Sequence, residues 1–139
     1  AMKNFLIMAL AILAVTACSK EEDPFQQEKN RLQGLWLLTE ITGGIAGTGY
    51  EANFSHLEIT SQDRYALLDR ESSIILQEGD YRLRTENEEL IIAFTPDTSE
   101  EVFFYDVEKT VTFGERDRQL RLSDPCCDLF VYQFEREEE

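Results

Sequence analysis

Short stretches with strand character alternate with turn residues from residue 35 to residue 136, and this succession restricts the fold more than any other feature of the chain. The breaks contain glycine, proline and short polar residues, which favour tight turns, and they lie at residues 43–44, 61–63, 70–72, 86–88, 95–97, 114–117 and 123–125. The candidate strands between them are residues 35–42, 54–60, 65–69, 73–77, 80–85, 90–95, 102–105, 110–113, 119–123 and 129–136. Short strands at near-regular spacing, without a long helical period, indicate an all-β sandwich or barrel.

Alternation of apolar and polar residues identifies an inward and an outward face on several of these strands. In the last strand, Phe130, Tyr132 and Phe134 share one side. In residues 80–85, Tyr81 and Leu83 alternate with charged residues. An antiparallel up-and-down β-barrel of about eight strands fits this pattern, because closure removes the exposed sheet edges.

The candidate strands outnumber those of such a barrel, so we expect some of them to merge. Residues 73–85 could form one strand that bends at Gly79. Residues 26–33 are expected to form a short helical turn before the first strand.

The charge of the chain excludes one class of partner. The 139 residues are enough for one domain and carry a formal net charge of −15. Such a chain repels the phosphates of nucleic acids, so no nucleic-acid partner is expected. The same charge argues against electrostatic attraction to anionic lipid, so any membrane contact must be hydrophobic or covalent.

The first 17 residues have the composition of a secretory signal peptide. Lys3 precedes an unbroken apolar run of 11 residues at 5–15. A membrane-spanning helix needs roughly 20 such residues. The run is therefore too short to span and has the length of a signal-peptide core, with the small residues Thr16 and Ala17 at its end.

Val15-Thr16-Ala17-Cys18 resembles the lipobox of bacterial lipoproteins. This resemblance implies cleavage before Cys18 and acylation of that cysteine, which would anchor the protein covalently in a membrane. Residues 19–23, Ser-Lys-Glu-Glu-Asp, are similar to the surface-export signal of Bacteroidetes lipoproteins. The resemblance implies a lipid-anchored outer-membrane protein that faces the cell exterior. From composition and the strand pattern we expect a flexible tether at 18–31, a barrel domain at 32–136 and an acidic tail at 137–139.

Several short motifs resemble those of small lipocalin-like lipoproteins. They are Gly34-x-Trp36 at the start of the first strand, Gly79-Asp80-Tyr81 in mid-chain, and Leu120-x-Leu122 with Tyr132-x-Phe134 at the end. The resemblance extends over residues 32–136 and implies a barrel whose interior holds one small ligand. The ligand-contacting residues at the interior or mouth would be Trp36, Tyr81, Leu83, Phe130, Tyr132 and Phe134.

A meander barrel with an even number of strands brings the end of the last strand beside the start of the first. Arg136 is therefore expected near Trp36. Lipocalins place an arginine over that tryptophan as a cation–π contact, and the resemblance gives Arg136 this role.

Cys126 and Cys127 are adjacent and are the cysteines that remain once Cys18 is acylated. Adjacent Cα atoms lie about 3.8 Å apart, below the usual disulfide range, so a bridge between them would be strained. The alternatives are a vicinal disulfide, two thiols, or metal or redox chemistry. Zinc is poorly supported because a structural zinc site takes four ligands.

No catalytic residue, metal site or cofactor is predicted, and we expect the protein not to be an enzyme. His56 is the only histidine, and catalysis would require a nucleophile and an orienting carboxylate beside it. The glycine-rich residues 43–49 lack the lysine and helix of a phosphate-binding loop and fit a loop at the barrel mouth.

Two functions follow from these expectations. The first is a binding protein that holds a small apolar or amphipathic ligand in the barrel. The second is a non-catalytic subunit or inhibitor in an envelope complex, whose barrel is packed solid. A ligand-sized interior space favours the first, and an interior filled by aromatic side chains favours the second.

Overall fold

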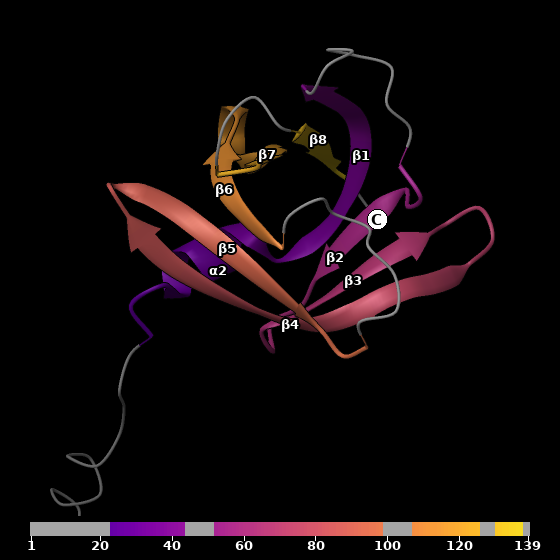
Figure 1. Ribbon diagram of the computed structural model, residues 1–139, viewed down its shortest axis with the longest axis horizontal. Coiled ribbons are helices and arrows are strands. Elements are labelled where there is room, and N and C mark those ends of the chain that lie inside the picture. The colour runs from indigo at the N-terminus through magenta and orange to yellow at the C-terminus, as the bar shows by residue number, and fades with distance from the viewer. Residues whose placement is uncertain (1–22, 44–51, 99–106, 126–129, 138–139) are drawn as a thin grey trace, which may run out of the picture.

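The computed structural model is a closed antiparallel β-barrel in which each strand pairs with its neighbours in sequence and β1 also pairs with β8 (Figure 1). The structure describes residues 23–43, 52–98, 107–125 and 130–137. The elements are α2 (Gln26–Leu32), β1 (Gly34–Gly43), β2 (His56–Ile59), β3 (Arg64–Asp69), β4 (Ile74–Glu86), β5 (Glu89–Pro96), β6 (Glu108–Phe113), the short 3₁₀ helix η1 (Glu115–Asp117), β7 (Gln119–Ser123) and β8 (Phe130–Arg136). The prediction of an eight-stranded all-β barrel with one short N-terminal helix is confirmed.

Closure of the barrel takes place at β1. Trp36 lies opposite Leu57 of β2 on one side and opposite Arg136 of β8 on the other. A register shift between Leu38 and Glu40 bends the strand, as a bulge does. The first and last strands therefore meet as the even-strand argument requires.

The long strand β4 replaces two of the expected strands. Its 13 residues pair with β3 up to Asp80 and with β5 from Gly79 onward. A side chain at position 79 would not fit, because a Cβ there would lie 2.1 Å from the carbonyl oxygen of Thr95. Glycine therefore allows the two halves of β4 to serve both neighbours. The expected strand at 102–105 lies outside the described residues.

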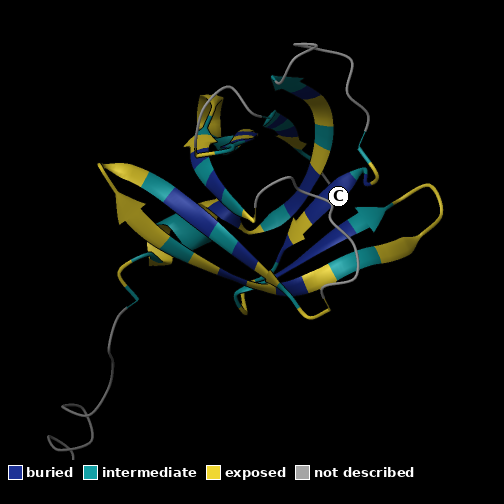
Figure 2. Cartoon of the chain, viewed as in Figure 1, coloured by how far each residue is buried: buried dark blue, intermediate teal, exposed yellow. Residues whose placement is uncertain are grey.

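Burial alternates along the strands and separates a packed interior from a polar outer wall (Figure 2). In β7 the apolar Leu120 and Leu122 are buried and their neighbours are not. In β8, Tyr132 and Phe134 are buried in the same way. One core cluster joins all eight strands, because inward side chains of a small barrel fill its centre.

The helix α2 covers one end of the barrel, which we call the closed end. Leu32 is fully buried, and its carbonyl oxygen accepts a hydrogen bond of 2.8 Å from the indole Nε1 of Trp36. The expected helical turn is thus present. The stretch expected to be a flexible tether therefore includes, from Asp23 onward, residues that pack on the barrel.

The opposite end, which we call the mouth, lies where β1 ends and β8 begins, since Gly43 pairs with Phe130 there. The hairpin between β3 and β4 also lies at this end. Among the described residues, no helix has the length and apolar composition needed to cross a membrane.

Candidate functional site

Aromatic side chains occupy the middle of the barrel. Four of the six residues expected to contact a ligand are buried, with exposures of 0% for Trp36, 3% for Tyr81, 5% for Tyr132 and 1% for Phe134. The other two, Leu83 and Phe130, are partly buried and pack against the same cluster. The structure therefore brings all six into one core.

Phe54, which precedes β2, completes this aromatic core. Its ring stacks at 6.4 Å on both Tyr132 and Phe134. A side chain that lined a ligand-sized space would keep exposed surface toward it, whereas these rings are almost wholly covered. The aromatic residues therefore fill the part of the interior in which they lie.

Arg136 lies over Trp36 at the closed end, as predicted. Its guanidinium carbon lies 4.2 Å from the ring centroid of Trp36, which is a cation–π distance. Its nitrogens donate hydrogen bonds to the carbonyl oxygens of Gln33 at 2.7 Å, Arg31 at 2.6 Å and Asp117 at 3.2 Å. Arg136 thus joins β8 to the end of α2 and to η1, and burial lowers its pKa.

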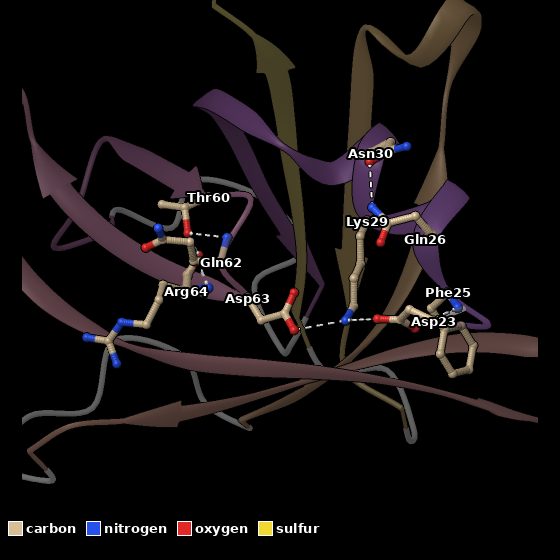
Figure 3. A network of polar contacts seen from close by, with 9 residues as sticks. All are labelled: Asp23, Phe25, Gln26, Lys29, Asn30, Thr60, Gln62, Asp63 and Arg64. Carbon is tan, nitrogen blue, oxygen red and sulfur yellow. Dashed lines mark hydrogen bonds and ion pairs between the residues drawn. The ribbon is translucent and has the colours of Figure 1, made fainter. Parts of the chain in front are cut away.

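A second polar cluster at the closed end fixes the N-terminal segment (Figure 3). The ammonium of Lys29 donates to the carboxylate of Asp23 and, at 2.9 Å, to that of Asp63 in the turn between β2 and β3. Burial alone would lower the pKa of Lys29, but hydrogen bonds to the two carboxylates raise it. The hydrogen bond from Lys29, with one from the backbone N–H of Phe25, lowers the pKa of Asp23. We call Lys29, Asp23 and Asp63 the Lys29 bridge.

Tyr81 points from the core toward this bridge. Its hydroxyl is buried and has no hydrogen-bond partner among the described residues. Burial, with a smaller effect of the Asp63 charge, raises the pKa of Tyr81 to about 12. The phenol therefore stays neutral at physiological pH and acts as an apolar ring in the core.

A buried ion pair lies near the mouth and was not foreseen from the sequence. Lys109 of β6 is fully buried and pairs with Asp124, which follows β7 and whose side chain is also fully buried. The ammonium lies 5.6 Å from the ring centroid of Tyr132. The second carboxylate oxygen of Asp124 accepts a hydrogen bond of 3.1 Å from the backbone N–H of Phe130. The pair therefore connects β6, β7 and β8 inside the barrel.

One signal in the sequence could have revealed this pair. Alternation in β6 extends backward from Val111 to residue 109, which places a lysine on the inward face. A buried ammonium needs a partner, because an unpaired charge in an apolar interior is very costly. Asp124 could not be chosen in advance, because several acidic residues lie in turns near that end.

His56 lies on the outer wall and is 6% exposed. Its Nδ1 is 2.8 Å from the hydroxyl oxygen of Ser55, and its Nε2 is 2.5 Å from Oε2 of Glu137. The Glu137 contact is close but does not have the direction of a hydrogen bond, so it is an ion pair only when the imidazole is protonated.

The Ser55 hydroxyl is also held by the backbone. It accepts a hydrogen bond of 3.0 Å from the N–H of Arg70 and lies 3.2 Å from the carbonyl oxygen of Leu68. Ser55, His56 and Glu137 therefore connect the start of β2 to the turn after β3 and to the end of β8. The Ser55 hydroxyl is thus held by backbone groups and is not placed as a free nucleophile. The absence of catalysis stays a prediction.

Hollows are present on the outer surface. One of about 280 Å³ lies over β1, β6, β7 and β8 and is lined by outward residues such as Thr39, Arg121 and Gln133. Another of about 470 Å³ lies between α2, the β4–β5 hairpin and β6, with Glu28, Arg31 and Phe113 in its lining. These surfaces are accessible to a partner without any change in the core.

Three predicted site residues, Cys18, Cys126 and Cys127, lie outside the described residues. Within the described part of the chain, no group of three or more histidine, cysteine, aspartate or glutamate side chains is placed to hold a metal ion.

Comparison of the chain with protein-family models, with curated proteins and with solved structures gives no match.

Proposed function

We propose that this chain is a lipid-anchored envelope protein whose barrel is a rigid, packed body that acts by binding another protein through its outer surface. The observation that carries this proposal is the filled interior, where Trp36, Tyr81, Tyr132 and Phe134 have exposures of 0–5%. A ligand pocket for a small molecule usually has a volume of about 300 Å³ or more. With at most 5% of their surface exposed, these core rings have little surface that could face such a space.

The anchoring part of the proposal is supported by the sequence. The lipobox-like residues 15–18 favour acylation of Cys18, and the acidic residues that follow favour export to the outer face of the outer membrane. The proposal needs no catalytic group and no cofactor.

Two measurements test the proposal separately. Cys18→Ser should move the protein from the membrane to the soluble fraction, and mass spectrometry of the wild-type N-terminal peptide should find acyl chains on Cys18. A Cys18→Ser protein that stays in the membrane would contradict the anchor.

For the packed interior, titration with the apolar fluorophore N-phenyl-1-naphthylamine should give no saturable binding, and saturable one-to-one binding would contradict it.

A second candidate is the binding of a small amphipathic ligand at the mouth. One observation favours it: the ammonium of Lys109 lies within the barrel beside the Tyr132 ring, where it could meet an acidic head group. Binding there requires the ligand to replace Asp124, which already neutralises Lys109. The fluorophore titration separates the two candidates: the packed barrel gives no saturable signal, whereas a binding site at the mouth gives a saturable signal that Lys109→Met weakens.

A further inference from the structure

We propose that the closed end of the barrel faces the membrane and that the mouth points away from it. This inference rests on the proposed anchor at Cys18. It adds the orientation of the barrel, which decides which surfaces a partner in the aqueous phase can reach.

The N-terminal segment joins the fold at the closed end. The Lys29 bridge connects Asp23 to Asp63, and Asp63 lies in the β2–β3 turn at the closed end. The backbone N–H of Gln26 also donates a hydrogen bond of 3.1 Å to the carbonyl oxygen of Asp23. Asp23 is therefore held at the closed end of the barrel.

The chain between Cys18 and Asp23 has a limited reach. Five residue steps separate them. However that segment is arranged, an extended chain spans at most about 3.6 Å per residue, or about 18 Å in total. The acylated residue must therefore lie within this distance of the closed end.

This reach is shorter than the height of the barrel. β1 has 10 residues, which at about 3.3 Å per residue is about 30 Å of strand from the first Cα to the last. A strand tilt of about 40° reduces this to about 23 Å along the barrel axis. The tether is therefore too short to let the mouth rest on the membrane while Cys18 is inserted.

This orientation also determines whether the exposed apolar residues face the membrane or the aqueous phase. Ile74 and Ile75, 52% and 56% exposed, lie at the start of β4 in the β3–β4 hairpin. Because this hairpin belongs to the mouth, these side chains do not serve as membrane contacts of the anchored molecule. They are presented to the aqueous side, together with Val107, which is 51% exposed.

Energy transfer from tryptophan to the membrane tests the orientation, because Trp36 is the only tryptophan in the chain. The acylated full-length protein is reconstituted into phosphatidylcholine vesicles that contain dansyl-phosphatidylethanolamine. Two variants in the Trp36→Phe background carry the donor at matched exposed positions, Gln62→Trp at the closed end and Ile75→Trp at the mouth. We expect severalfold more transfer from the donor at position 62 than from the donor at position 75.

Two controls keep the outcome interpretable. If Trp36→Phe prevents folding, Ile75→Trp is added to the otherwise unchanged chain, and the mean transfer efficiency should fall below that of wild type. Equal or greater transfer from position 75, in protein that floats with the vesicles, overturns the orientation and leaves the anchor intact. Protein that carries no acyl chain and does not float overturns the anchor, and the orientation with it.

Discussion

Arg136 combines two kinds of contact that are usually considered separately. It stacks on Trp36 and also donates hydrogen bonds to three backbone carbonyl groups, two of them at the end of α2. We expect Arg136→Met to lower the free energy of unfolding by about 2–4 kcal/mol, because hydrogen bonds from a charged donor and a cation–π contact are lost together.

Urea unfolding at neutral pH measures this effect. Arg82→Met, on the exposed face of β4, is the matched control and should change stability by less than about 0.5 kcal/mol. Equal effects of the two substitutions would show that Arg136 does not hold the closed end together.

A substitution at Tyr81 is expected to have the opposite effect on stability. Its buried hydroxyl lacks a hydrogen-bond partner among the described residues, so removal of the oxygen relieves a desolvation cost. Tyr81→Phe should leave the melting temperature unchanged or raise it, with a gain of up to about 1 kcal/mol. A clear loss of stability would show that the hydroxyl has a partner. In the wild type, absorbance near 295 nm should show a tyrosine that titrates near pH 12.

At the scale of single residues, the sequence predicts some contacts and not others. Arg136 was predictable because the even strand number and antiparallel closure place it beside Trp36. Lys29 was not, because its partner Asp63 is 34 residues away in a turn with no distinctive sequence. Long polar side chains reach partners that only the assembled fold specifies.

Among the elements, α2 depends on pH through the Lys29 bridge. The pKa of Asp23 in the folded protein lies below its ordinary value of 3.8. A carboxylate with a lowered folded pKa contributes stability above its unfolded pKa, and this contribution is lost as the pH falls through the folded pKa. We therefore expect the free energy of unfolding to decrease below about pH 4.

Asp23→Asn isolates this contribution. The variant should be less stable than wild type at neutral pH, and the difference should shrink as the pH falls below about 4. Thermal unfolding followed by circular dichroism across this range provides the comparison. A difference that is independent of pH would mean that the charge of Asp23 does not stabilise the fold.

Strand β4 depends on Gly79, where a Cβ would meet the Thr95 carbonyl oxygen and the Cα of Pro96. Gly79→Ala should cost about 1–3 kcal/mol, since backbone atoms must shift to accept the methyl group. Glu78→Ala, at the adjacent exposed position, should stay within about 0.5 kcal/mol of wild type. The denaturant midpoints of the two variants measure this difference. Similar midpoints would show that β4 does not depend on glycine at position 79.

The elements were largely predictable because alternation and turn chemistry are local properties. β7 has the predicted bounds of 119–123, and α2 falls within the predicted helical turn. The merging of 73–77 with 80–85 needed the contact between Gly79 and Thr95, which the sequence suggests only as a bend.

On the scale of the whole molecule, two properties of the barrel have different origins. Closure follows from strand number and pairing, and it was predictable from the sequence. The filling of the interior depends also on Phe54, which precedes β2 and stacks its ring on both Tyr132 and Phe134. A segment outside the regular strands thereby contributes to the packed interior on which the proposed function rests.

Native mass spectrometry of the protein purified from the cells that make it tests the packed-barrel proposal most directly. We predict the mass of the acylated chain, alone or with a protein partner, and no small molecule bound within the barrel. A small apolar molecule retained at one-to-one stoichiometry would contradict the packed interior and favour the carrier function instead.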